Sequence, residues 1–393
     1  MSQNYATLRA PQRLLFGAGP SMVAPRVYAA LSQPVVGHLD PFFFQVNEEI
    51  RSLLSYAFST SNEFNLALSG TGSSGMEAAV ASFTEPGRKF ALLTNGYFGE
   101  RMGEMAARQG AQVVRLESDW GKPFDPQEAR EFIRRERPSV VGFVQAETST
   151  GVFNQAKPIC EAAHELDALV IADCVTSLGT MPVLVDDNGI DIAHSCTQKG
   201  LGCPPGLAPI TVSPRALERL RARTAPVPTW YLDLRLLDTY FTGRRYHHTA
   251  SATMFYALRE GLALIAEEGR EARWERHRRN QVAFVAGLEA MGLEMLVEEP
   301  HRIWALNTPR VPKGVDDAKL RQHLLTDRGI EIAGGFGPLA GQIFRIGLMG
   351  YGSTAENVLL VLDALEEALK LQGYRSAGDA RGAAERALAA TVS

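Results

Sequence analysis

Short apolar runs alternate with amphipathic stretches between Asn65 and about Pro209 of this 393-residue chain. The runs are rich in β-branched and aromatic residues, and the stretches between them carry apolar residues at helical spacing. Such alternation predicts crossover units and a mostly parallel sheet with helices on both faces. We expect seven strands, at Phe64–Leu68, Phe90–Thr94, Gln112–Leu116, Val140–Gln145, Leu169–Ala172, Ile190–Ser195 and Ala208–Val212. Helices are expected between them, for example at Gly75–Phe83, Glu100–Gln109 and Pro126–Arg137.

The pattern divides the chain into unequal parts. Residues 1–20 form an arm with little periodicity, and residues 21–265 form a large α/β domain. A long helical region, roughly Ser251 to Met291, leads into a smaller α+β domain at residues 266–375. Two domains of this kind fit the length of the chain.

Two charged or polar segments are interpreted without any functional role. The run GREARWERHRRNQ alternates in sign at helical spacing, which is typical of a solvated helix face. Residues 376–393 are small and polar, and we expect this tail to be poorly ordered.

Composition excludes several function classes. A formal net charge of -4 gives no electrostatic case for nucleic acid or for an anionic membrane. The sequence shows no signal peptide and no apolar run of membrane-spanning length. Without CxxC spacing, the four cysteines argue against a disulfide framework or a zinc site and favour a reduced, cytoplasmic protein. They are Cys160, Cys174, Cys196 and Cys203.

A glycine-rich loop, Gly70–Gly75, follows one predicted strand and opens a helix. Backbone N–H groups at a helix start favour a phosphate, and the hydroxyls of Thr71 and Ser73 can donate to it. The same spacing occurs in dinucleotide folds, which place an acidic residue at the end of the second strand. Here that strand ends in Asn95 and Gly96, so a nicotinamide-dependent dehydrogenase is the weaker interpretation, and a structural turn is the alternative.

Asp173 ends one apolar run, and Lys199 follows the next in SCTQKG. Enzymes that use pyridoxal phosphate (PLP) need a lysine to form a Schiff base and a carboxylate to keep the pyridine nitrogen protonated. Each residue alone has an ordinary alternative, a loop cap for the aspartate and a solvent-exposed side chain for the lysine.

Arg345 lies inside the apolar, strand-like run GQIFRIGLMG. A buried guanidinium needs an anion, and a bidentate contact suits the carboxylate of an amino or keto acid. The alternative is an ion pair within the chain. Phe98 could stack on a heteroaromatic ring or belong to the core. The adjacent histidines in YHHTAS lack ligand spacing, so no metal is predicted.

These motifs together resemble one known family. FGAGPS, SGTGSSGMEAA, TNGYFGER, AETSTGV, IADCVTSLG, SCTQKGLGCPPG and YHHTAS occur in the order and spacing of the class V (fold-type I) PLP-dependent aminotransferases. The resemblance is closest to the alanine–glyoxylate and serine–pyruvate group, and it runs from about Leu14 to Leu371. It implies a fold-type I α/β architecture and a homodimer with shared active sites.

The resemblance also implies a role for individual residues. Lys199 would carry the Schiff base and shuttle the proton, and Asp173 would pair with the pyridine nitrogen. The remaining positions implied are Val175 and Phe98 on the two ring faces, Thr148 at the ring 3-oxygen, Gly72, Ser73 and Gln198 at the phosphate, Tyr246 and Thr249 at the phosphate of the neighbouring subunit, and Arg345 with backbone near Gly19 at the substrate carboxylate.

The expected reaction moves the amino group of a small neutral amino acid, alanine or serine, to glyoxylate and gives glycine and a 2-keto acid. No second carboxylate-binding arginine stands near the motifs, which disfavours acidic donors. An (S)-ureidoglycine–glyoxylate aminotransferase is the alternative, although those enzymes carry amide side chains where this chain has His38 and Tyr246. A non-catalytic PLP-sensing protein is the alternative from another class, against which the intact Lys199 and Arg345 speak.

Overall fold

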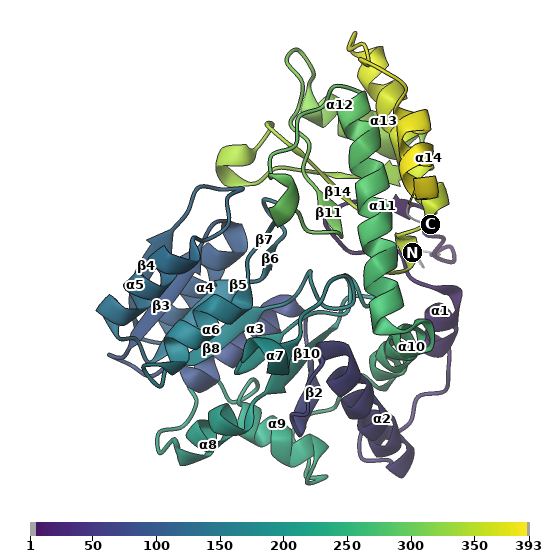
Figure 1. The fold of residues 1–393 in the computed structure, drawn as a ribbon. Helices are drawn as coiled ribbons and strands as arrows, with labels where there is room; N and C mark the ends of the chain where they lie inside the picture. The colour runs from purple at the N-terminus through teal and green to yellow at the C-terminus, as the bar shows by residue number, and fades with distance from the viewer. Residues whose placement is uncertain (1–4, 391–393) are drawn as a thin grey trace.

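A seven-stranded sheet forms the centre of the large domain in the computed structural model, which describes residues 5–390 (Figure 1). Within these residues, β10 pairs antiparallel with both of its neighbours, and the other neighbouring strands of this sheet are parallel. The seven predicted strands and the mostly parallel arrangement are confirmed. In spatial order the strands are β2 (Phe64–Ser69), β10 (Leu207–Val212), β9 (Ile192–His194), β8 (Leu169–Asp173), β5 (Val140–Val144), β3 (Lys89–Thr94) and β4 (Gln112–Glu117).

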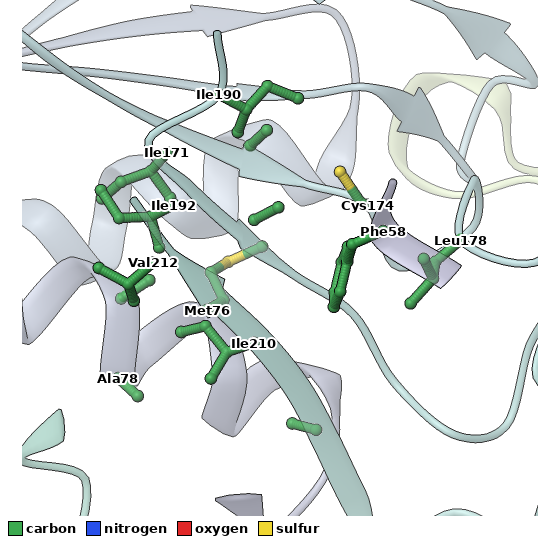
Figure 2. Close-up of a cluster of buried hydrophobic side chains, with 14 of the residues drawn as sticks. Phe58, Met76, Ala78, Ile171, Cys174, Leu178, Ile190, Ile192, Ile210 and Val212 are labelled. Carbon is green, nitrogen blue, oxygen red and sulfur yellow. The ribbon is translucent and has the colours of Figure 1, made fainter. Parts of the chain in front are cut away.

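Helices cover the sheet because their apolar stripes pack on it. Figure 2 shows side chains of α3, β8, β9 and β10 gathered in one buried cluster, including Met76, Ile171, Ile192 and Ile210. The predicted helices are confirmed, with α3 and α4 each starting three residues earlier than expected. The covering helices are α3 (Gly72–Phe83), α4 (Tyr97–Arg108), α5 (Pro126–Glu136) and α6 (Ala156–His164).

The large domain contains further elements that the pattern did not single out. Helix α10 packs on both α1 and α2, and α2 also contacts β2. Asp40 caps α2 by accepting a hydrogen bond of 2.8 Å from the backbone N–H of Phe42. These elements are α1 (Pro25–Leu31), α2 (Pro41–Phe58), β6 (Ala146–Glu147), β7 (Val152–Phe153), α7 (Val185–Asn188), α8 (Pro214–Ala222), α9 (Leu234–Phe241) and α10 (Ala252–Glu268).

The long helical region is two helices. Gly269, at φ 84°, ends α10 and begins α11 (Arg270–Ala290). Glycine adopts this positive φ without the steric cost that a Cβ would bring. Helix α11 then runs from the large domain up to the smaller one (Figure 1).

The smaller domain has its own buried core, and the N-terminal arm contributes to it. Phe16 is fully buried in this core, and β1 (Leu14–Leu15) pairs parallel with β12 (Ile330–Glu331). A three-stranded antiparallel sheet has the order β11 (Leu306–Asn307), β14 (Phe344–Gly347) and β13 (Ala333–Gly334). Helices α12 (Asp317–Asp327) and α13 (Ala355–Leu371) and the short 3-10 turns Glu299–His301, Gly337–Leu339 and Gly350–Gly352 complete it.

The tail is more ordered than its composition predicted. Residues Ala380–Ala390 form helix α14, which packs against α11 and α13. Ala380 and Ala384 are buried in the core of the smaller domain. Alanine has the highest helix propensity and lets two helices approach closely, so a small-residue segment can form a packed helix once a partner is present. Residues 391–393 lie outside the described part of the chain.

Among residues 5–390 we find no helix with the length and apolar character required to cross a bilayer.

The packing of α14 can be tested at Ala384. Replacing Ala384 with Asp places an unpaired carboxylate in an apolar contact, so the free energy of unfolding should fall by ~3 kcal/mol or more. The matched control is Ala389→Asp on the exposed side of the same helix, which should change it by less than about 0.5 kcal/mol. Urea unfolding of both variants measures the difference, and equal stabilities would contradict the packing of α14.

Candidate active site

The carboxyl ends of the parallel strands bring the predicted site residues together at one edge of the sheet, as expected for an open α/β fold. A cavity of about 180 Å³ lies there. Nine residues predicted from the sequence line it: Thr71, Gly72, Ser73, Phe98, Thr148, Asp173, Val175, Gln198 and Lys199. Met76, Arg101 and Val144 also line it and were not predicted.

Asp173 is buried at the end of β8 and faces this cavity. Its Oδ1 accepts a hydrogen bond of 2.8 Å from the backbone N–H of Val175. Burial raises the pKa of Asp173 to about 6, although the Val175 N–H and the charges of Arg101 and Lys199 oppose this rise. The carboxylate therefore lacks a full partner within the described residues, and a protonated ring nitrogen would supply one.

Lys199 stands in the turn that follows β9, and its side chain is partly buried with the amine largely desolvated. The Nζ donates a hydrogen bond to the carbonyl of Ala18 in the N-terminal arm. Desolvation lowers the pKa of Lys199, and the nearby charge of Arg345 lowers it further. Both effects favour the uncharged amine, which is the nucleophilic form.

The residue that follows the arm, Ser21, fixes the backbone of the Lys199 turn. Ser21 donates from its hydroxyl to the carbonyl of Lys199 at 2.7 Å and from its N–H to the carbonyl of Gln198 at 2.9 Å. A Cβ on Gly19 would lie 2.5 Å from the Lys199 Nζ and would displace it, and the φ of 104° at this position is strained for any residue other than glycine. Gly19, predicted at the substrate carboxylate, thus lies directly beside the reactive amine.

The glycine-rich loop lies at the N-terminus of α3, where free N–H groups and the helix dipole favour an anion. The backbone here packs closely, because a Cβ on Gly72 would meet Val175 at 3.1 Å and Cys196 at 3.2 Å. The Oε1 of Gln198 is buried and has no hydrogen-bond partner among residues 5–390. The donors that a phosphate ester could use here are the Nε2 of Gln198, the hydroxyls of Thr71 and Ser73, and the N–H groups of the helix N-terminus.

Phe98 is positioned by a buried carboxylate, and Thr148 by a neighbouring hydroxyl. Glu147 accepts hydrogen bonds from the N–H groups of Phe98 at 3.1 Å and Gly99 at 3.2 Å, and so caps the start of α4. It also accepts from the hydroxyl of Ser149 at 2.6 Å. The hydroxyls of Thr148 and Thr176 lie 2.5 Å apart, so Thr148 is held in place facing the cavity.

Arg345 is buried on β14 and does not form an ion pair with any carboxylate of residues 5–390. Its guanidinium donates to the carbonyls of Gly334 at 2.7 Å and Thr148 at 3.3 Å, and it lies 4.0 Å from the ring centre of Phe336. Burial lowers the pKa of Arg345 to about 10. An unpaired buried cation near Lys199 is suited to bind an anionic ligand.

Two predicted residues lie apart from this cavity. Tyr246 is 62% exposed and Thr249 is also exposed, and neither lines it. Their assignment to a neighbouring subunit stays a prediction. The ring of Tyr246 lies 5.1 Å from the ring of His38, so these two residues are adjacent in space.

The histidines between Tyr246 and Thr249 serve the packing of the chain. His247 stacks on Trp230 with 4.2 Å between ring centres, and His248 lies 2.8 Å from the hydroxyl of Ser69. In the part of the chain that the structure describes, no three His, Cys, Asp or Glu side chains are grouped to hold a metal ion.

The charged run on α11 is not simply a solvated face, which corrects the sequence interpretation. Arg273 and His277 are buried. Arg273 donates to the carbonyls of Gly179 at 3.0 Å and Gly200 at 2.8 Å, and so ties the loops after Asp173 and Lys199 together. Their spacing of one helical turn was the available signal, but the alternating charges around them concealed which face was inward.

Comparisons with known proteins agree with this arrangement. The aminotransferase class-V family model matches residues 13–358. An (S)-ureidoglycine–glyoxylate transaminase of Bacillus subtilis (strain 168) is 41% identical over 378 residues, covering 91% of each chain. An alanine–glyoxylate aminotransferase of Drosophila melanogaster is 38% identical over 369 residues, covering 92% of this chain and 94% of the relative. The crystal structure of an alanine–glyoxylate aminotransferase from Nostoc sp. superposes with a TM-score of 0.92 at 43% identity, covering 93% and 98% of the two chains.

The buried carboxyl of Asp173 predicts a pH-dependent stability of the cofactor-free protein. Its pKa is about 6 in the folded protein and ordinarily 3.8, so the folded protein holds this proton more tightly than the unfolded chain. The carboxyl therefore makes the folded state progressively less stable as the pH rises between these two values. Asp173→Asn removes the ionisation, so from about pH 4 to about pH 7 its stability relative to wild type should rise by ~2 kcal/mol. Urea unfolding at both pH values measures this, and a difference independent of pH would contradict it.

Proposed function

The chain belongs to the class V aminotransferases, and from this premise we propose that it transfers the amino group of alanine or serine to glyoxylate. The products are glycine and pyruvate or hydroxypyruvate. The observation that carries the proposal is the buried Arg345, which has no carboxylate partner among residues 5–390 and lies near the amine of Lys199. A carboxylate held there would place the α-carbon of a small amino acid beside that amine.

The residues of the cavity fit pyridoxal phosphate as the cofactor. Its phosphate would bind at Thr71, Gly72, Ser73 and Gln198, its ring between Phe98 and Val175, its ring nitrogen at Asp173 and its 3-oxygen at Thr148. The cofactor supplies a carbonyl that captures the amino group and a ring that accepts the electrons left when the α-proton is removed.

Each protein group then has a separate task. The Asp173 carboxylate, whose ionised form is costly without a partner, keeps a proton on the ring nitrogen. The Lys199 Nζ, whose pKa is lowered by desolvation, takes the proton from the α-carbon of the substrate and can return it to another carbon within reach. Arg345 holds the carboxylates of the amino donor and of glyoxylate in turn.

The charges at the site indicate which amino donors can bind. Arg345 serves the carboxylate that every amino acid carries, and Arg101, the arginine that lines the cavity, is hydrogen-bonded to Ser73 of the glycine-rich loop. An acidic side chain would need a further cation, whereas alanine and serine would not. Small neutral donors are therefore favoured.

The (S)-ureidoglycine–glyoxylate reaction is the second candidate, because the Bacillus subtilis relative of that name is 41% identical. A ureido group presents both N–H donors and a carbonyl acceptor, which an amide side chain matches. The adjacent His38 and Tyr246 offer rings instead of amides at the positions in question. This difference places alanine or serine first.

The proposed working form is a homodimer in the cytoplasm. The exposed Tyr246 and Thr249, unused by their own cavity, support a contact with the phosphate of a second copy. The cysteines are free and buried, which suits a reducing compartment.

A donor scan tests the proposal. Alanine, serine, glutamate and ureidoglycine are each added to the purified protein loaded with PLP, without an acceptor, and the visible absorbance of the cofactor is followed. Alanine or serine should bleach it, and glyoxylate should restore it. Lys199→Ala is the control and should show no such cycle. Bleaching by ureidoglycine alone would support the second candidate, and no bleaching by any donor would contradict turnover.

Arg345→Ala removes the proposed carboxylate anchor. Losing a charge-assisted contact should raise the KM for both the amino donor and glyoxylate by roughly 10- to 100-fold. As a control, binding of PLP to Arg345→Ala is measured, and it should be unchanged because Arg345 does not line the cofactor cavity. Steady-state kinetics with each substrate varied in turn measures the effect, and an unchanged KM would place the carboxylate site elsewhere.

A further inference from the structure

Arg101 is a cavity residue to which neither the motifs nor the proposed reaction gives a role. It lies on α4, one turn after Phe98, and it lines the cavity together with the glycine-rich loop. Its Nη1 donates a hydrogen bond of 2.8 Å to the hydroxyl of Ser73 in that loop. The guanidinium thus lies at the end of the cavity where the phosphate of the cofactor would bind.

The guanidinium is fixed in position but is not neutralised. Its carbon lies 4.8 Å from the ring centre of Phe98 and 5.2 Å from that of Tyr97, which holds the group by cation–π contacts. In the described part of the chain, residues 5–390, no carboxylate forms an ion pair with it. The positive charge of Arg101 also opposes the rise in the pKa of Asp173, so its electrostatic effect extends across the cavity.

The predicted phosphate ligands of this chain carry no charge. Thr71, Gly72, Ser73 and Gln198 offer hydroxyls, an amide and backbone N–H groups, whereas a phosphate ester carries a charge between -1.5 and -2 near pH 7. Burying such an anion is costly unless a cation accompanies it. Because Ser73 accepts the hydrogen bond from Arg101, its own hydroxyl hydrogen remains available for a phosphate oxygen.

We propose that Arg101 is a binding residue for the cofactor phosphate and supplies the positive charge that the glycine-rich loop lacks. It orients the Ser73 hydroxyl as a donor, and its cation–π contact with Phe98 holds the guanidinium beside the glycine-rich loop. The inference rests on the proposed use of PLP.

The test compares PLP with pyridoxal, which lacks the phosphate. Cofactor-free wild type, R101Q and R101K are titrated with each compound at equilibrium. The matched control is R108Q on the same helix, because the side chain of Arg108 is 75% exposed and paired with Glu104. R101Q should bind PLP roughly 10- to 100-fold more weakly and pyridoxal as wild type does, since a hydrogen bond to a charged group is lost only with PLP. R101K should fall between, and R108Q should match wild type.

Inorganic phosphate gives a second readout that needs no cofactor and no activity. It should raise the thermal midpoint of cofactor-free wild type and R108Q, and this rise should be absent in R101Q. The midpoints of the variants without phosphate show that each is folded.

The outcomes separate the two proposals. If wild type binds neither PLP nor pyridoxal, the proposed function fails. If wild type binds PLP and R101Q binds it equally well, only the role of Arg101 is overturned. If R101Q weakens PLP and pyridoxal by the same factor, Arg101 acts through Phe98 and the ring instead of through the phosphate, which also overturns the inference.

Discussion

The burial of the Lys199 amine is the constraint on which the site depends. A desolvated amine loses its hydration, so the protein must supply an acceptor and tune the surrounding charge. The carbonyl of Ala18 is the acceptor, and the guanidinium of Arg345 helps to lower the pKa of the amine. Gly19 leaves the space that this contact needs. The arm, the large domain and the smaller domain therefore all interact with the Nζ atom of Lys199.

This meeting point also links the two domains. The N–H of Gly347, two residues beyond Arg345, donates to the carbonyl of Phe16 at 2.8 Å, so the arm that supplies Ala18 also pairs with the strand of the carboxylate anchor. On the other side, Arg273 holds the carbonyl of Gly200, and His277 accepts from the N–H of Gly350 at 2.9 Å. The distance between the amine and the carboxylate site is thus set by contacts from both domains.

The charged side chains along the cavity are arranged in an order that suits the proposed ligands. A cation is available for the cofactor phosphate, an anion for the ring nitrogen and a second cation for the substrate carboxylate. Arg101 stands beside the glycine-rich loop, Asp173 faces the centre, and Arg345 lies beyond Lys199 towards the smaller domain. Each of these groups is buried or partly buried and none is neutralised by a partner in residues 5–390. Uncompensated buried charges are expensive in an empty protein, and they are commonly retained where a ligand completes them.

The sequence by itself determined the features that depend on local pattern. Alternating apolar runs identified the seven strands, and the glycine-rich loop, Asp173 and Lys199 stood at strand ends where a parallel sheet gathers ligands. The tertiary structure alone decided the features that depend on which face another element covers. Arg101 reaches Ser73, Arg273 turns inward from a charged run, the arm carbonyl of Ala18 reaches Lys199, and α14 orders against α11. These contacts join residues far apart in the chain, and periodicity carries no information about partners at that separation.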